Sequence, residues 1–284
     1  MRWVSLVVCC ACGRVNFDRG TDASGDVLGE FSTALPIAEL DSGLGEDDPS
    51  LTGDLLEIYF QSNRSGSERL YYATRGSRTS AWSAVLPVDA VNAGGNSNNA
   101  KITPDGLTLV FASQRAPNAG GSDLWITTRA DRSAAWSAPR RIDELATTTS
   151  DFEPWLAAND LYYVATPVPA DPQLVVAQRA LPSDPFGPPT ELTVLCSGSY
   201  DGGPWVSRSG LVFMFHSLRD SARAATEMYV ATRPTTMDEW GAPELSPFNA
   251  PADDTDPWLS PDGTTFVFSS NRDGGMYKLY MATR

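Results

Sequence analysis

The chain has 284 residues, of which 35 are Asp or Glu and 21 are Lys or Arg, so its net charge is −14. This acidic balance argues against a nucleic-acid partner, because phosphates are bound through Lys and Arg. It is compatible with a cationic partner or a cation site. Beyond residue 12 the only cysteine is Cys196, so no internal disulfide can form there and we expect a buried thiol. No metal-ligand spacing is present, and we expect neither a metal nor a cofactor.

The chain begins with a segment typical of secretion. In residues 1–12 the charged Arg2 precedes an apolar run that is too short to span a bilayer. Its end, Ala11-Cys12, resembles a bacterial lipobox, although Cys9 stands where Leu is usual. The resemblance implies lipidation at Cys12 and a location at the cell envelope, facing the periplasm or the exterior. A plain secretory signal and a buried strand remain as alternatives, and the Gly-, Asp- and Ser-rich residues 13–30 are expected to form a flexible tether.

From residue 31 onward the chain is built from a unit of about 50 residues that occurs five times, and such internal repeats indicate a repeat architecture. The unit begins with a three-residue anchor, clearest at Asp256-Pro257-Trp258, followed by a tight Pro-Asp-Gly turn. A run of β-branched and aromatic residues comes next, and two further strand segments complete the unit. The last of these is expected to open with an aromatic residue, at Trp82, Trp136, Phe186 and Trp240. Four short strands are typical of one blade of a β-propeller. The blades are expected to start near residues 46, 97, 151, 201 and 254.

The fifth unit ends at Arg284, after its third strand. Its missing fourth strand is expected at the other end of the chain, because residues 31–40 match residues 136–145 closely. Such an N-terminal strand closes the ring and removes an open sheet edge. We therefore predict an all-β fold over residues 31–284, a five-bladed propeller of four-stranded antiparallel blades closed by the N-terminal strand.

The repeat also resembles the WD40-like repeat of the TolB propeller family. The resemblance covers about residues 46–284 and is most complete in residues 256–284, which carry Ser-Pro-Asp-Gly, Ser-x-Arg and Ala-Thr-Arg in order. It implies an envelope scaffold that binds proteins or peptides. The N-terminal α/β domain of TolB has no counterpart here, so a Tol-Pal role is not implied. We expect a non-catalytic scaffold that binds a protein or peptide through one face or the central channel and touches the membrane only through its lipid.

Candidate binding residues lie where the innermost strands begin, at the mouth of the central channel. Because these acids recur with the repeat, they are expected to accept turn N–H groups or to pair with the Ser-x-Arg arginines of an adjacent blade. A cation site is a second possibility. A third is glycan binding or glycoside hydrolysis, for which two carboxylates about 5 to 9 Å apart suffice. The tryptophans would wedge between blades as core or stack on a sugar. The candidates are the acids Asp48, Glu153, Asp201, Asp254 and Asp256 and the tryptophans Trp155, Trp205 and Trp258, and the arginines are Arg64, Arg115, Arg219 and Arg272.

The residues present argue against a peptidase. A serine nucleophile needs a histidine-type base, and the only histidine, His216, lies inside an expected strand beside Ser217. We expect His216 to be structural. Three long loops, at residues 115–122, 166–173 and 219–226, are expected to join second and third strands on one face, where added length often carries binding.

Overall fold

The computed structural model describes residues 30–166, 172–220, 222 and 225–284. The expected signal, Cys12 and nearly all of the tether lie outside the described residues, as do parts of the loops 166–173 and 219–226. Among the described helices, none has the length and apolar character needed to cross a membrane.

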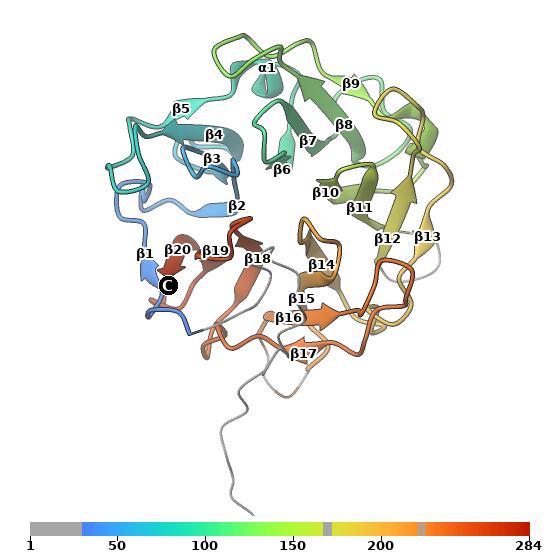
Figure 1. The fold of residues 1–284 in the computed structure, drawn as a ribbon. Coiled ribbons are helices and arrows are strands. Elements are labelled where there is room, and N and C mark those ends of the chain that lie inside the picture. Colours follow the sequence, from blue (N-terminus) through green and yellow to red (C-terminus); the bar gives the residue numbers. More distant parts are fainter. Residues whose placement is uncertain (1–29, 167–171, 221, 223–224) are drawn as a thin grey trace, which may run out of the picture.

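Five separate four-stranded antiparallel sheets surround a central axis (Figure 1), as the repeat predicted. Each blade has three strands of six or seven residues and an outer strand of two residues. A helical turn, α1 (Asp89–Asn92), and a 3-10 turn (Asp143–Leu145) precede β6 and β10. The strands are β2 (Glu46–Leu51), β3 (Glu57–Ser62), β4 (Arg69–Thr74) and β5 (Leu86–Pro87) in blade one; β6 (Ser97–Ile102), β7 (Thr108–Ser113), β8 (Asp123–Thr128) and β9 (Arg140–Arg141) in blade two; β10 (Asp151–Ala157), β11 (Asp160–Ala165), β12 (Gln173–Gln178) and β13 (Thr190–Glu191) in blade three; β14 (Asp201–Val206), β15 (Val212–Ser217), β16 (Glu227–Thr232) and β17 (Glu244–Leu245) in blade four; and β18 (Asp254–Leu259), β19 (Thr265–Ser270), β20 (Lys278–Thr283) and β1 (Leu35–Pro36) in blade five.

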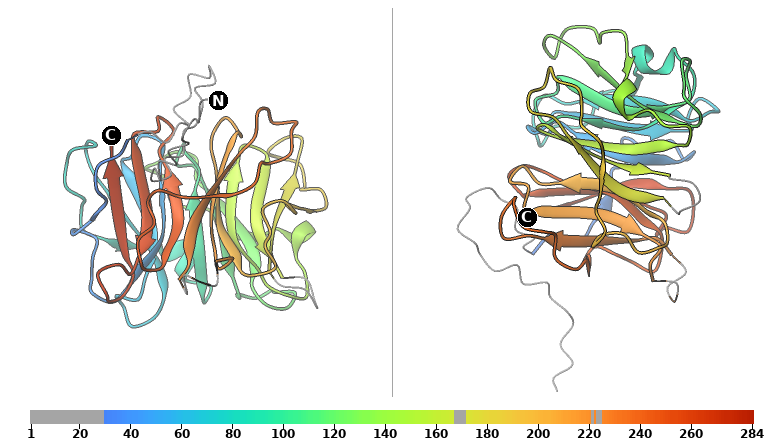
Figure 2. Two further views of the ribbon diagram at one scale, coloured as in Figure 1. Left: turned by 90° about the horizontal axis from the view of Figure 1, so that it is seen from below. Right: turned by 90° about the vertical axis from the view of Figure 1, so that its right-hand side faces the viewer.

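The strands run through the thickness of a disc whose two faces differ (Figure 2). The innermost strands β2, β6, β10, β14 and β18 begin at one face, which we call the entry face and which also carries the loops joining second to third strands. The opposite face, the turn face, carries the tight turns that join first to second strands and the loops that join third to fourth strands.

The N-terminal strand closes the ring, as expected. Leu35 and Pro36 of β1 pair antiparallel with Met281 and Tyr280 of β20. The main chain adds a hydrogen bond from Ser32 N to the Thr283 carbonyl at 2.8 Å. The last blade therefore has its fourth strand, and the outer edge of β20 is covered.

Each innermost strand carries a β-bulge at the anchor of the repeat. In blade five, for example, Asp256 and Pro257 together oppose the single residue Phe268, between the pairs Thr255–Ser269 and Trp258–Val267. The first bulge residue has a positive φ in all five blades, a conformation that costs a side-chain-bearing residue energy. These residues are Asp48, Asn99, Glu153, Gly203 and Asp256, with φ between 51° and 58°.

The Ser-x-Arg arginines clamp acids of their own blade, so the expected pairing with an adjacent blade is wrong. Arg272 Nη2 lies 2.5 Å from Asp254 Oδ1 and donates to the Phe248 carbonyl at 2.8 Å, while its Nε donates to Ser270 Oγ. Ser270 ends the second strand opposite Asp254, which begins the innermost strand of the same blade, so the guanidinium that follows meets its own blade's acid. Blades one and four repeat the clamp with Arg64–Glu46 and Arg219–Asp201.

A second set of arginines, at the ends of the third strands, stacks on the aromatics expected to open the fourth strands. Arg233, for example, lies 4.2 Å above the ring of Trp240. The fourth strand of that blade starts only at Glu244, so the aromatic belongs to the loop before it. The expected role of these aromatics as strand residues is therefore wrong, and they hold the loop against the blade by cation–π contact.

We predict that Arg272→Ala lowers the free energy of unfolding by about 3 kcal/mol, because it leaves the fully buried Asp254 carboxylate without its cation. Arg115→Ala is the matched control. In that blade the guanidinium bonds Ser97 Oγ and not an acid, so we expect a clearly smaller loss. Denaturant unfolding of the two variants measures the difference, and equal losses would contradict the clamp as an electrostatic device.

Candidate functional site

The bulges bring three carboxylates together at the axis, near the entry face. Asp48, Glu153 and Asp256 come from blades one, three and five, and their side chains are only 2%, 7% and 4% exposed. Because a bulge turns its first residue out of the strand's regular alternation, the same position in each blade points inward. The other two blades contribute Asn99, whose Nδ2 donates to Asp48 Oδ2 at 2.8 Å, and Gly203.

Lys101 supplies the positive charge at the centre. This buried ammonium lies 3.3 Å from Asp48 Oδ1 and 3.8 Å from Asp256 Oδ1. The attraction of the two carboxylates, with a smaller contribution from Glu153, outweighs burial and raises the pKa of Lys101. The site therefore holds a permanent cation among three acids, a balance that leaves excess negative charge in a poorly solvated place.

His216 lies between the carboxylates of blades three and five. Its Nδ1 accepts a hydrogen bond from Asp256 N at 3.2 Å, so in the neutral ring the proton is on Nε2. Nε2 faces Glu153 Oε1 at 3.9 Å, and Nδ1 is 3.9 Å from Asp256 Oδ1. The ring needs a residue without a side chain beside it, because a Cβ on Gly203 would lie 2.5 Å from Nδ1. His216 is thus both structural, as expected, and a member of the axial group.

Glu153 is held from two sides. The Tyr200 hydroxyl donates to Oε1 at 2.6 Å, and the main-chain N–H of Gly203 donates to Oε2 at 2.6 Å. Burial of Tyr200, together with the charge of Glu153, raises the pKa of that phenol far above its usual range, so the phenol stays a donor. Tyr200 is half-buried and stacks with the half-buried Phe152, at a ring separation of 6.3 Å and an interplanar angle of 6°.

Burial raises the pKa of Asp48 to about 7, with repulsion from Asp256 adding to the shift and attraction by Lys101 opposing it. The neighbouring Asp47 also has a pKa well above its usual range, for the same two reasons of burial and repulsion from Asp256. Asp47, Asp48 and Asp256 offer oxygens that all lie within 4.8 Å of one another. Such proximity suits a shared proton or a cation, and Lys101 already provides a cation there.

The other candidates from the sequence lie elsewhere. Asp201 and Asp254 were expected at the channel mouth, but each accepts from Ser-x-Arg groups of its own blade and is fully buried. The tryptophans Trp155, Trp205 and Trp258 are 3% to 5% exposed and line a pocket toward the turn face. Trp155 Nε1 donates to the Val206 carbonyl of the next blade at 3.2 Å, which is the interblade wedge that the sequence offered as one of two alternatives.

Sequence reasoning missed Lys101, Tyr200 and Asp47. A signal for Lys101 was present, because it occupies the third anchor position, where three other blades have tryptophan. A lysine at an otherwise apolar position of a repeat points to a local acid. No comparable signal marks Tyr200, which lies in the loop before β14 and reaches Glu153 of the previous blade through the fold alone.

Comparison with known proteins identifies the fold but assigns the chain to no family. No protein-family model matches the chain, and no curated protein matches it. Among solved structures, the endo-arabinase of Bacteroides thetaiotaomicron has a TM-score of 0.60 at 13% identity, covering 90% of this chain and 98% of that one. The catalytic domain of the GH62 α-L-arabinofuranosidase of Coprinopsis cinerea has a TM-score of 0.59 at 15% identity, with coverage of 89% and 96%. TolB from Acinetobacter baumannii has a TM-score of 0.52 at 15% identity, and this chain covers 55% of its length.

These likenesses correct the main functional expectation. A TolB-like propeller is supported as a fold. The non-catalytic protein-binding scaffold is contradicted, because the similar structures include several arabinofuranosidases, an endo-arabinase and other glycoside hydrolases. They favour the alternative that the axial acids had suggested. At these levels of sequence identity the structures establish a shared fold, and the chemistry has to be argued from the site.

We predict that the stability of the protein falls as the pH rises from about 4 to about 7. Asp48 has a higher pKa in the folded chain than in the unfolded chain, so the native state binds the extra proton across this window, and deprotonation costs folding energy. Asp48→Asn should remove roughly 2 kcal/mol of this decline. Denaturant unfolding at several pH values measures it, and identical pH slopes for the variant and the parent would contradict the assignment.

Proposed function

We propose that the chain is a glycoside hydrolase whose reacting groups are the axial carboxylates. The observation that carries the proposal is the meeting of Asp48, Glu153 and Asp256 at the axis, where their partners among the described residues are Lys101, His216, Asn99, Tyr200 and the Gly203 N–H rather than an arginine. The acids that begin the innermost strands of blades one, four and five are clamped by arginine, as Asp254 is. Burying three acids without such a clamp lowers the stability of the folded chain. Buried acids with perturbed pKa values of this kind cluster at catalytic sites.

Glycoside hydrolysis needs one carboxylic acid that protonates the leaving oxygen and one carboxylate that activates water or attacks the sugar. Asp48 fits the proton donor, because its pKa of about 7 keeps it mostly protonated below neutral pH and half protonated near pH 7. Glu153 fits the second role, because Tyr200 and Gly203 both donate to it and fix its direction. Asp256, beside Asp48, positions the donor and sustains its raised pKa.

The substrate would enter from the entry face. Of the axial groups, Asp47, Asn99 and Tyr200 are half-buried there, whereas Asp48 and Asp256 lie beneath them. The stacked rings of Phe152 and Tyr200 offer an aromatic surface of the kind that sugars pack on. The titles of the similar structures suggest the substrate class, and we propose an arabinofuranoside.

We also propose a location for the protein from its first twelve residues. The run that ends in Ala11-Cys12 supports a protein that is lipidated at Cys12 and held at the cell envelope, with the propeller facing the periplasm or the exterior. Mass spectrometry of the processed N-terminus, in a bacterial host with lipoprotein export, tests this proposal. An unmodified or uncleaved N-terminus would contradict it.

We predict that the full chain releases p-nitrophenol from p-nitrophenyl α-L-arabinofuranoside. Asp48→Asn and Glu153→Gln should each lower kcat/KM by at least about 100-fold, because each removes a proton-transfer or nucleophilic role. Asp105→Asn, at an exposed tight turn of the turn face, is the control and should leave the rate unchanged.

Folding of these variants is checked by their melting temperatures. A parent chain that cleaves neither this compound nor arabinan would contradict the proposal. So would activity that survives in both variants.

A further inference from the structure

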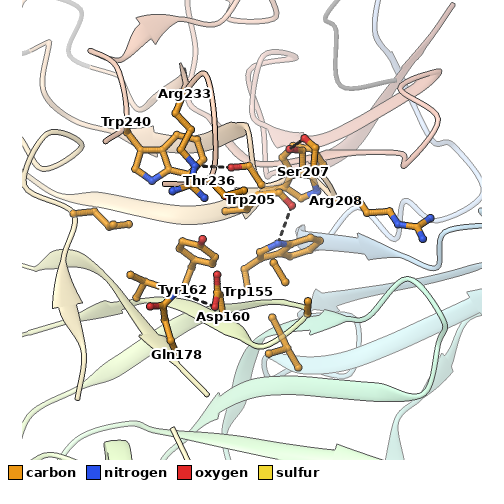
Figure 3. A pocket seen from close by; sticks show the side chains of 18 of the residues that line it. Trp155, Asp160, Tyr162, Gln178, Trp205, Ser207, Arg208, Arg233, Thr236 and Trp240 are labelled. Atoms are coloured by element: carbon orange, nitrogen blue, oxygen red, sulfur yellow. Dashed lines mark hydrogen bonds between the residues drawn. The ribbon is translucent and has the colours of Figure 1, made fainter. Parts of the chain in front are cut away.

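A pocket of about 710 Å³ opens on the turn face between blades three and four, on the opposite side of the disc from the proposed reaction site (Figure 3). Its wall includes Trp155, Trp205, Tyr162 and Trp240, and its polar groups include Asp160 and Thr236. The proposed hydrolase makes no use of it. We infer that this pocket binds a small organic cation with a planar guanidinium head, because the same position in another blade pair already holds one.

The template is the junction between blades one and two. There Glu57, the first residue of β3, accepts from two arginines of blade two: Arg129 Nη2 at 2.6 Å and Arg132 Nε at 2.8 Å. Arg132 also donates to Asp54 through Nη1. The head of Arg132 therefore occupies a seat between the blades that is lined by carboxylates, and the planar fork suits this arrangement.

The pocket is the same seat with its arginine missing. Asp160 is the first residue of β11 and so corresponds to Glu57. Arg233 directly follows the third strand of blade four, as Arg129 does in blade two, and both donate through Nε to the carbonyl of a turn glycine at 2.7 Å. Three residues further on, Thr236 replaces Arg132. Loss of the long side chain, with a shorter acid opposite, accounts for the hollow.

The carboxylate of this seat keeps no cation among the described residues. Gln178 Nε2 donates to Asp160 Oδ1 at 3.1 Å, as Figure 3 shows. Burial raises the pKa of Tyr162 to about 12, with the charge of Asp160 adding to the shift and the charge of Arg233 opposing it. Arg233 is held by the Gly210 carbonyl and lies 4.2 Å above the ring of Trp240. A half-buried acid beside an open cavity is an electrostatic site for a cation.

The other blade junctions help to define the class of ligand that this pocket suits. Between blades two and three, Thr108 replaces the acid and Pro182 replaces the arginine, and the hollow is only about 190 Å³. Between blades five and one, Arg78 fills the corresponding place and lies 2.5 Å from Asp262 Oδ2. Only the junction of blades three and four, within the described chain, combines an acid with an empty arginine position. A sugar is disfavoured because the indole rings are nearly buried, and Arg233 covers one face of Trp240.

The test is titration of the full chain with L-arginine amide by isothermal titration calorimetry, with L-citrulline amide as the probe of nearly the same shape whose side-chain head is an uncharged urea in place of the guanidinium. We expect binding of the arginine amide to be at least tenfold tighter. Asp160→Asn should weaken it at least tenfold. Thr236→Arg should abolish it and raise the melting temperature, because the chain then fills its own seat as Arg132 does.

Arg132→Ala is the matched control, since it should empty the seat between blades one and two and create a second site of the same preference. Equal binding of both amides, or binding unchanged by Thr236→Arg, would overturn the inference. So would arabino-oligosaccharides that displace the probe from this pocket. None of these readouts depends on hydrolysis, so failure here and failure of the proposed reaction are distinguishable.

Discussion

The positive-φ bulge on each innermost strand is the constraint on which the rest of this structure depends. It makes two residues of the strand oppose one residue of its neighbour, and it turns the first of the two toward the axis. The proline that follows in four blades suits such a place, because it has no N–H to lose. The main-chain N–H freed at the bulge then needs an acceptor. In three blades the preceding blade supplies it, through Gln61 to Asn99, Glu153 to Gly203 and His216 to Asp256. Polar side chains near the axis are therefore required by the fold before any chemistry is considered.

Charge decides which of these polar side chains do more than cap a bulge. The amide of Gln61 and the imidazole of His216 accept from the bulge N–H groups without adding negative charge. Three of the five bulge positions nevertheless hold carboxylates. Lys101 offsets part of their repulsion, and burial together with the remaining repulsion from Asp256 raises the pKa of Asp48. The same chain shows how it treats acids with a purely structural role, since Asp254 receives a guanidinium at 2.5 Å. The contrast between these two treatments is the physical ground for assigning chemistry to the axis.

The sequence predicted the architecture because each copy of the repeat carries the same turn and strand signals. Turn, strand and closing segment could each be inferred five times over, and the pairing of Leu35 with Met281 confirms the ring closure. The site was less accessible because it is built across blades. Asp48 and Asp254 look alike as strand-start acids, and only the bulge separates a residue that reaches the axis from one that reaches its own Ser-x-Arg arginine. The role of Tyr200 depends on a contact with Glu153 across a blade boundary, which no local pattern reports.

The residues that differ from the repeat are the ones to which we assign roles beyond forming the fold. Lys101 stands where other blades have tryptophan, and it carries the central charge. His216 stands where blade two has Ala112 and blade three has Val164, and it bridges two acids. Thr236 stands where blade two has Arg132, and a pocket results. In each case the surrounding blades show what the regular residue does, so the effect of the exception can be derived by comparison within one chain. A fivefold repeat thus supplies its own controls, and the functional argument rests on the residues that break it.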